Sequence, residues 1–337
     1  MDRRTFLKTS LAATTAAAAL GQFPKPAIAQ GGKQLTFAFF VKNVTNPNWK
    51  YARIGAEKAA KELNIKIEHV APTKPDNIEE QTRLTEDWTV RKPDGFVFVP
   101  VDFKALVPTV QKSIDAKIPV AIYSNNMPDV KGAVTYCGSD DEIIGYEVTK
   151  YLFNQLKGKG KVIYIDGVPA AITAQQRKAG FERAHKEFPN VELLASQPGM
   201  YRRLPAVQVI ENLMQRFPAI DAVACANDDM AVGVVEALIS AGRGDKTLVT
   251  GVDVISDAAT LIRDGKMFAS ADYSLHDQAY LAVHALAKHI KGEKVPPQLI
   301  LPVKIATKAN IAPWLKPVEE RPTPDWNEVV AAQKKGA

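Results

Sequence analysis

A strict alternation of short apolar runs with amphipathic helical patterns constrains the fold of this chain more than any other feature. The apolar runs are 35–41, 65–71, 95–101, 118–123, 161–166, 191–195, 221–226 and 247–252. Helical patterns lie between most of them, at 49–63, 76–91, 104–116, 142–156, 173–188, 204–216, 229–241 and 256–264. Such alternation is typical of βαβ units, and nearly all-apolar strands are expected where helices cover both faces of a parallel sheet. The sequence therefore predicts an α/β fold.

The chain also repeats itself. The stretch GAEKAAKEL (55–63) resembles GFERAHKEF (180–188), and the preceding runs FAFFV (37–41) and VIYID (162–166) lie at the same offset. A second pair, FVFVPVD (96–102) and AVACAND (222–228), follows at nearly the same spacing. The repeat predicts two similar lobes with a cleft between them.

Polar side chains follow the predicted strands. They occur in NVTNPNWK (43–50), PVD (100–102), SNN (124–126), GVPAAITAQQR (167–177), QPGMYRR (197–203), ANDD (226–229), GVD (251–253) and ASADYS (269–274). Ligands of open parallel sheets bind beyond the carboxyl ends of the strands. Amides, carboxylates and one arginine offer fixed donors and acceptors, and an aromatic ring can cover the C–H face of a sugar or polyol. The set suits a neutral ligand rich in hydroxyl groups.

The same residues also admit a structural interpretation, because Asn and Asp after strands form turns and cap helices. For Asp140 and Asp228, which precede helical patterns, capping is the preferred interpretation. Trp49 either stacks on a ligand or packs in the core, and Pro47 is expected at the first position of its helix.

Motifs for catalysis do not emerge from the residues. No G-x-G-x-x-G follows the first strand, GKGK (158–161) lacks the Ser or Thr of a phosphate-binding loop, and there is no G-x-S-x-G. The histidines lack metal-ligand spacing, and no basic block carries interleaved aromatic residues. We therefore expect no enzyme activity, no cofactor, no metal and no nucleic acid, although an exported α/β enzyme remains an alternative.

Residues 1–29 have the pattern of an export signal. Arg3 and Arg4 precede a short apolar run, and Ala27-Ile28-Ala29 has the small-x-small form of a cleavage site. The run is too short for a membrane span. RRTFLK resembles a twin-arginine signal, with a general secretory signal as the alternative. We expect cleavage near Ala29 and a periplasmic protein, with Cys137 and Cys225 as buried free thiols rather than a disulfide.

Together, TNPNW, PVDFKALVP, IPVAIYSNN, QQRKAGF, ANDDMAVG and GVDVISDA resemble the periplasmic sugar-binding proteins of ABC importers, of the ribose-binding type. The resemblance runs from about Leu35 to Pro302. It implies two Rossmann-like lobes with parallel sheets, joined by a three-segment hinge. The implied divisions are 35–139 with 274–302 for lobe 1, 140–273 with 303–316 for lobe 2, and 317–337 as a C-terminal tail that packs loosely or is disordered.

The family's ligand positions fall on residues of both lobes. In lobe 1 the resemblance implies that Asn46, the stacking aromatic Trp49 and its neighbour Asn48 contact the ligand. Ser124 and Asn125 occupy the ligand positions where ribose and galactose binders carry Asp-Arg. In lobe 2 the resemblance implies Arg177, Tyr201, Asn227 and Asp253, with Tyr273 in the hinge. Asp102 is a further candidate. Because the charged pair of lobe 1 is missing, we expect a neutral ligand other than plain ribose.

The resemblance implies a solute-binding component that closes on its ligand and delivers it to an ABC permease with its ATPase. The protein is expected to act as a monomer. A periplasmic sensor or chemoreceptor ligand-binding protein of the same fold remains an alternative.

Overall fold

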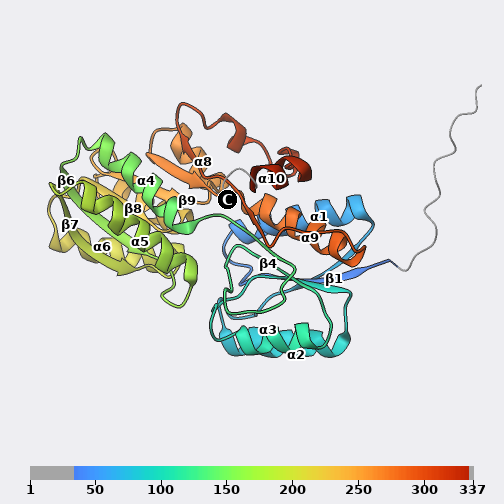
Figure 1. Cartoon of the computed structure of the whole chain (residues 1–337). Helices are drawn as coiled ribbons and strands as arrows, with labels where there is room; N and C mark the ends of the chain where they lie inside the picture. Colours follow the sequence, from blue (N-terminus) through green and yellow to red (C-terminus); the bar gives the residue numbers. More distant parts are fainter. Residues whose placement is uncertain (1–33, 334–337) are drawn as a thin grey trace, which may run out of the picture. The chain divides into compact units, whose positions relative to one another are not determined.

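The computed structural model describes residues 34–333, so the predicted export signal lies outside the described residues. From Leu35 onward the chain forms one compact unit. This unit contains two six-stranded sheets, each covered by helices (Figure 1).

The first sheet has the strand order β11-β5-β4-β3-β1-β2, and all of its pairs are parallel. Helices α2 and α3 cover one face, and α1 and α9 cover the other (Figure 1). The strands are β1 (Thr36–Phe40), β2 (Lys66–Val70), β3 (Gly95–Phe98), β4 (Val120–Tyr123), β5 (Thr135–Gly138) and β11 (Gln298–Ile300). The helices are α1 (Asn48–Leu63), α2 (Ile78–Arg91), α3 (Val107–Asp115) and α9 (Leu275–Ile290).

The second sheet has the order β12-β10-β9-β8-β6-β7, and only the edge strand β12 is antiparallel to its neighbour. Its strands are β6 (Gly160–Asp166), β7 (Val191–Pro198), β8 (Ala222–Cys225), β9 (Leu248–Val252), β10 (Ala269–Asp272) and β12 (Lys304–Thr307). Its helices are α4 (Asp141–Gln155), α5 (Ile172–Glu187), α6 (Arg203–Arg216), α7 (Asp228–Ser240) and α8 (Ser256–Arg263). The predicted class, two α/β lobes with parallel sheets, is confirmed.

The internal repeat has a physical basis in helix contacts. A Cβ on Gly55 of α1 would lie 2.0 Å from the carbonyl oxygen of His276 in α9. A Cβ on Gly180 of α5, the equivalent position, would lie 2.1 Å from the carbonyl oxygen of Glu142 in α4. Each lobe therefore contains one helix pair whose backbones approach closely, and only glycine fits at the point of contact.

The chain passes between the sheets three times at strand ends: from β5 to α4, from β10 to α9 and from β11 to β12. Side-chain hydrogen bonds connect the first two of these passages. The Ser139 hydroxyl and the Gln278 amide both donate to the carbonyl of Tyr273, at 3.1 and 2.7 Å. Cys137 and Cys225 lie in different sheets, and both are buried free thiols, as predicted.

The segment expected to be a C-terminal tail carries regular secondary structure over its described residues. After β12 the chain forms two short 3₁₀ helices, η1 (Ala312–Leu315) and η2 (Val318–Glu320), and then α10 (Trp326–Gln333). Trp314 and Val318 are buried in the apolar core of the second lobe. The proline-rich composition of residues 317–337 does not reveal the tertiary contacts of Val318 and Trp326.

Replacing either contact glycine should destabilise the fold. Gly55→Ala and Gly180→Ala should each lower the free energy of unfolding by about 1–3 kcal/mol, because overpacking outweighs the better helix propensity of alanine. Urea denaturation would measure this. Lys50→Ala, on the exposed face of α1, is the matched control. Unchanged stability in both glycine variants would contradict the close helix contacts.

Candidate functional site

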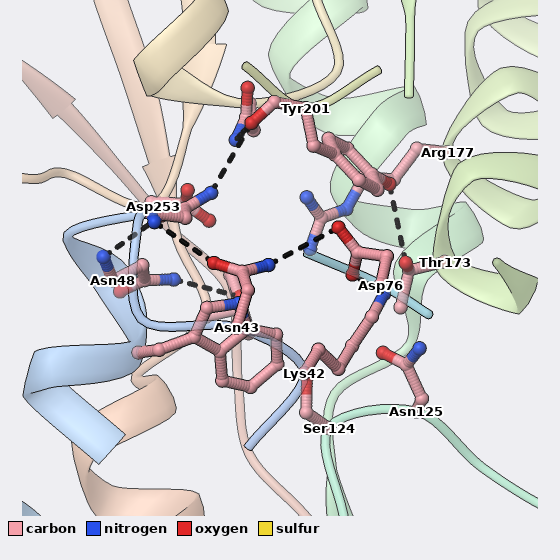
Figure 2. Close-up of a pocket in the computed structure, with 14 residues that line it drawn as sticks. Lys42, Asn43, Asn48, Asp76, Ser124, Asn125, Thr173, Arg177, Tyr201 and Asp253 are labelled. Atoms are coloured by element: carbon pink, nitrogen blue, oxygen red, sulfur yellow. Dashed lines mark hydrogen bonds and ion pairs between the residues drawn. The ribbon is translucent and has the colours of Figure 1, made fainter. Parts of the chain in front are cut away.

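A cavity between the carboxyl ends of the two sheets contains ten of the ligand positions that the sequence predicts, all except Asp102. It encloses ≈ 410 Å³ of space between atoms, part of it open to solvent. Its walls combine amides, charged groups and aromatic rings from both lobes (Figure 2). The lining residues are Lys42, Asn43, Asn46, Asn48, Trp49, Asp76, Ser124, Asn125, Thr173, Arg177, Tyr201, Asn227, Asp253 and Tyr273.

The amides of NVTNPNWK build the loop between β1 and α1. The side-chain oxygen of Asn43 accepts from the backbone N–H of Asn46 at 2.9 Å, and the side-chain oxygen of Asn46 accepts from that of Asn48 at 2.9 Å. Both side-chain oxygens therefore accept hydrogen bonds from backbone N–H groups of the turn. The NH₂ groups point elsewhere: that of Asn46 lies 3.5 Å from the carbonyl of Tyr201 in the other lobe.

A buried ion pair extends the cavity wall in the first lobe. The ammonium of Lys42 lies 3.6 Å from the Asp76 carboxylate, and the Asn43 amide donates to the same carboxylate at 3.2 Å (Figure 2). Burial lowers the pKa of Lys42, while Asp76 opposes that shift. The ammonium also lies 5.9 Å from the ring centre of Tyr201, across the cleft.

The end of β4 and the start of α1 form the rest of the wall in the first lobe. Ser124 has a left-handed backbone (φ 59°), and its carbonyl accepts from the Tyr136 hydroxyl at 2.8 Å. The Asn125 amide donates to the Pro100 carbonyl at 3.1 Å. Trp49 both lines the cavity and packs edge-on against Tyr123, with ring centres 6.4 Å apart, so the two interpretations of this residue are compatible.

Arg177 is the central cation of the second lobe. Its Nε donates to the Asp141 carboxylate at 2.7 Å, and one terminal nitrogen donates to the carbonyl of Ala226 at 2.8 Å. Both side chains of the ion pair are 4% exposed. Burial raises the pKa of Asp141 to about 6, against the pull of Arg177, so the pair is ionised at neutral pH.

Tyr273 connects this cation to the first lobe. The Arg177 guanidinium lies 4.8 Å from the centre of the Tyr273 ring, and the Asn48 amide donates to the Tyr273 hydroxyl at 2.9 Å. The aromatic side chain in the hinge is therefore a wall of the cavity and a contact between lobes.

A strained loop after β9 presents Asp253. Asp253 and Val254 both have positive φ, at 124° and 52°. The buried carboxylate of Asp228 holds the loop: it accepts from the backbone N–H of Ile255 at 3.1 Å and from the Ser270 hydroxyl at 2.7 Å. Strain of this kind is retained where surrounding bonds over-determine the conformation.

Burial raises the pKa of Asp253 well above its usual value, and the charge of Arg177 opposes the shift. Burial also raises the pKa of Asp228, to about 7, while the hydroxyl of Ser270 lowers it. Asp253 faces the cavity, whereas Asp228 is fully buried behind it. A hydroxyl group that donates to Asp253 would replace the hydrogen bonds that this carboxylate loses on leaving water.

Tyr201 forms the opposite wall. Met200 and Tyr201 both have left-handed backbones, and the Tyr201 hydroxyl lies 3.2 Å from that of Thr173 (Figure 2). A Cβ on Gly167 would lie 2.3 Å from the Tyr201 ring, so glycine there leaves room for the aromatic side chain. The Asn227 amide donates to the Tyr201 carbonyl at 3.4 Å.

The structure brings all ten predicted positions to one cavity, together with four that sequence reasoning missed: Lys42, Asn43, Asp76 and Thr173. Asn43 and Thr173 lie within the strand-end stretches 43–50 and 167–177, and Lys42 directly precedes the first of them, so the strand-end rule could have found all three. Asp76, from the loop before α2, carries no such signal. Asp102 does not line the cavity; its carboxylate accepts from the backbone N–H groups of Lys104 and Ala105 in a turn.

Of the three residues that the sequence assigns to helix starts, the structure confirms Asp140 and corrects Asp228 and Pro47. Asp140 caps α4 as predicted, accepting from Ile143 N–H at 3.0 Å. The prediction for Asp228 was wrong: Asn227 caps α7, accepting from Met230 N–H at 3.1 Å, because Asp228 turns inward to Ser270. Pro47 precedes the first helical residue, Asn48, rather than occupying that position.

Within residues 34–333, no helix is long and apolar enough to cross a membrane. Nor does that part of the chain group His, Cys, Asp and Glu side chains in a way that could hold a metal ion.

Comparison with known proteins agrees with this geometry. The periplasmic binding protein domain profile matches residues 37–294. The D-ribose/D-allose-binding protein of Pseudomonas aeruginosa is 30% identical, over 86% of this chain and 93% of its own length. The D-allose-binding periplasmic protein of Escherichia coli is 29% identical, over 77% of this chain and 86% of its own.

Solved structures give the same result. A periplasmic solute-binding protein of an ABC transporter from Actinobacillus succinogenes, with bound D-allose, superposes with a TM-score of 0.79 and 28% identity. The match covers 83% of this chain and 99% of that one. A solute-binding protein from Mycobacterium smegmatis with bound glycerol gives a TM-score of 0.78 and 26% identity, over 84% of this chain and 98% of that one.

The matching family model and these relatives are those of solute-binding proteins, not of enzymes. The chain belongs to the periplasmic binding protein family. Membership of this family implies a periplasmic location.

The raised pKa of Asp228 predicts a pH-dependent effect of one substitution. The folded protein holds this proton more tightly than the unfolded chain, so the stability it contributes is present below about pH 4 and is lost as pH rises toward about 7. Asp228→Asn has no such proton. Its free energy of unfolding relative to wild type should therefore rise by about 1–3 kcal/mol between about pH 4.5 and pH 8.

Urea denaturation at several pH values would measure the difference, with Asp129→Asn, at an exposed position, as the control. If the difference in free energy of unfolding between Asp228→Asn and wild type is the same at every pH, Asp228 is ionised in the folded protein over the whole range.

Proposed function

We propose that this chain is the solute-binding component of an ABC importer, which captures a neutral sugar or polyol in the cleft and delivers it to a membrane permease. One observation carries the proposal: a single cavity combines buried donors and acceptors from both lobes with aromatic walls. A small polyhydroxyl ligand has the matching donors, acceptors and C–H faces.

The donors and acceptors suit hydroxyl groups in particular. Arg177 has five N–H bonds; one donates to the Asp141 carboxylate and one to the Ala226 carbonyl. The remaining donors and the Asp253 carboxylate line the same cavity. A hydroxyl group can accept from the arginine and donate to the carboxylate at once, which supports a ligand with adjacent hydroxyls.

The balance of charge supports a neutral ligand. The two cations of the cavity wall each have an anionic partner, Lys42 with Asp76 and Arg177 with Asp141. An anionic ligand would compete for the cation of one of these buried pairs, and breaking such a pair costs about 3–5 kcal/mol. Burial raises the pKa of Asp253, the other carboxyl group of the wall, well above its usual value, which disfavours the negative charge that a cationic ligand would need.

Lys42 and Asp76 change the inference drawn from the missing Asp-Arg pair. We propose that this ion pair supplies the charged contact of the first lobe, from the β1 and β2 ends instead of the β4 end. The ligand can then have as many hydroxyl groups as ribose, but their arrangement should differ from one that contacts an Asp-Arg pair after β4.

The proposed mechanism is closure about the hinge. The lobes, residues 35–139 with 274–302 and residues 140–273 with 303–316, would move as bodies. A ligand that contacts Asn46 and Lys42 on one side and Arg177 and Asp253 on the other favours the closed form, because only that form makes both sets of contacts. A permease would then recognise the closed protein.

Export, cleavage near Ala29 and action as a monomer complete the proposal. Family membership supports a periplasmic location.

A thermal-shift screen would test the ligand class. Residues 30–337 would be screened against D-allose, D-ribose, myo-inositol, glycerol, a sugar acid and an amino sugar. A hundredfold excess over Kd stabilises the folded form by about 2.7 kcal/mol, so a true ligand should raise the melting temperature clearly. We expect a shift with a neutral polyhydroxyl compound, lost in Asp253→Ala.

Asp264→Ala, at an exposed position, is the control and should keep the shift. A shift with the acid or the amine alone would overturn the neutral ligand class. Micromolar binding of ribose would contradict the expectation of a different sugar.

Lys42 offers a separate test of the first lobe. Lys42→Met should weaken binding of the ligand from the screen about 10–100-fold, because a hydrogen bond to a charged group contributes about 1.5–3 kcal/mol. Isothermal titration calorimetry would measure the affinity. Lys50→Met, exposed on α1, should bind like wild type, and equal affinity in both variants would remove Lys42 from the proposed site.

A further inference from the structure

The segment after β12 makes an additional connection between the lobes. We name residues 311–333 the strap. It begins on the second lobe and ends on the first. It is therefore a fourth connection between the lobes, in addition to the three passages at strand ends. Figure 1 shows it in dark red, with α10 beside α9.

The first half of the strap is anchored in the second lobe. Ile311, Trp314 and Val318 are buried in that lobe's apolar core. The Trp314 indole donates to the Asp272 carboxylate, at the end of β10, at 2.8 Å. Burial raises the pKa of Asp272, and the indole N–H opposes the shift.

The second half is anchored in the first lobe. Trp326, Val329 and Val330 pack against that lobe's apolar core, and the ammonium of Lys288 in α9 lies 5.3 Å from the Trp326 ring. The Gln333 side chain pairs with both backbone groups of Ile300, accepting its N–H at 3.0 Å and donating to its carbonyl at 3.1 Å. In this way α10 pairs with the last residue of the edge strand β11.

Arg321 connects the first half of the strap to α1. Its guanidinium donates to the carbonyls of Trp314 at 2.8 Å and Lys316 at 3.3 Å, and lies 5.4 Å from the ring of Tyr51. The Lys58 ammonium donates to the Arg321 carbonyl at 3.2 Å. Pro317, Pro322 and Pro324 restrict the backbone on either side.

Tyr51 itself joins the lobes. It belongs to α1, yet its ring is buried with the core of the second lobe. Its hydroxyl accepts from the backbone N–H of Ser256, at the start of α8, at 2.9 Å and lies 2.7 Å from the Ser256 hydroxyl. Arg321 therefore covers a side chain that already spans the hinge.

We propose that the strap sets the balance between open and closed forms by holding the lobes at the angle seen here. In this conformation the polar groups of the cleft already meet across the lobes, as the contacts from Asn46 to Tyr201 and from Asn48 to Tyr273 show. Opening would pull Arg321 and Lys58 apart or lift α10 from β11. The strap thus favours the closed form before ligand arrives, and a ligand binds more tightly when the competent form is more populated.

Arg321→Ala in the full chain tests this proposal. Spin labels on Arg83→Cys in α2 and Glu211→Cys in α6, both exposed positions, would report the distance between lobes by pulsed electron paramagnetic resonance. The buried thiols Cys137 and Cys225 should stay unlabelled. Lys316→Ala is the matched control, since it removes the same charge from an exposed side chain of the strap.

Without ligand, Arg321→Ala should shift the distance distribution toward longer values, while Lys316→Ala should match the parent protein. An unchanged distribution in Arg321→Ala, with a melting curve showing a folded protein, would overturn the proposal. This readout needs no ligand, so it can fail or succeed independently of the proposed function.

The effect on affinity rests on the proposed function. With the ligand found in the screen, Arg321→Ala should raise Kd about three- to tenfold although no cleft residue has changed. A more open free protein with an unchanged Kd would show that the strap holds the lobes without contributing to capture, and would overturn that half of the proposal alone.

Discussion

The buried ion pair of Arg177 and Asp141 is the interaction on which the site depends. Arg177 reaches Asp141 at the first passage between lobes, the carbonyl of Ala226 at the end of β8 and the ring of Tyr273 at the second passage. Removing either ion would leave an uncompensated charge in a buried setting, which is strongly unfavourable. One side chain at the cavity wall thereby contacts two hinge segments and a strand end.

The remaining site is prepared by bonds that do not involve a ligand. Asp228 holds the loop that presents Asp253, Gly167 leaves space for the Tyr201 ring, and Asn43 orders the loop that carries Asn46 and Trp49. Such preorganisation lowers the ordering entropy that binding must overcome. The flexible element is then the angle between lobes, where Tyr51, Tyr273 and the strap make their contacts.

Most of the candidate site could be predicted from the sequence, because in open parallel sheets the ligand-binding residues follow the carboxyl ends of the strands. That rule, with the family resemblance, led to all ten proposed positions in the cavity, from Asn46 to Tyr273. It failed for Asp76, which lies in the loop before α2 and reaches the cavity only because β2 is paired beside β1. The separate interpretation of Asp228 as a helix cap was wrong because its buried partner, Ser270, cannot be recognised from the sequence.

The sequence by itself determined the two α/β lobes, their repeat and the polar strand ends, because hydrophobic periodicity and glycine positions are local properties of the chain. Tertiary structure alone decided which charges are paired and where the strap lies. Lys42 meets Asp76, and Arg321 meets Tyr51, across distances in sequence that no local pattern encodes. Burial and long-range contact set the energies of these groups, and both exist only once the lobes have formed.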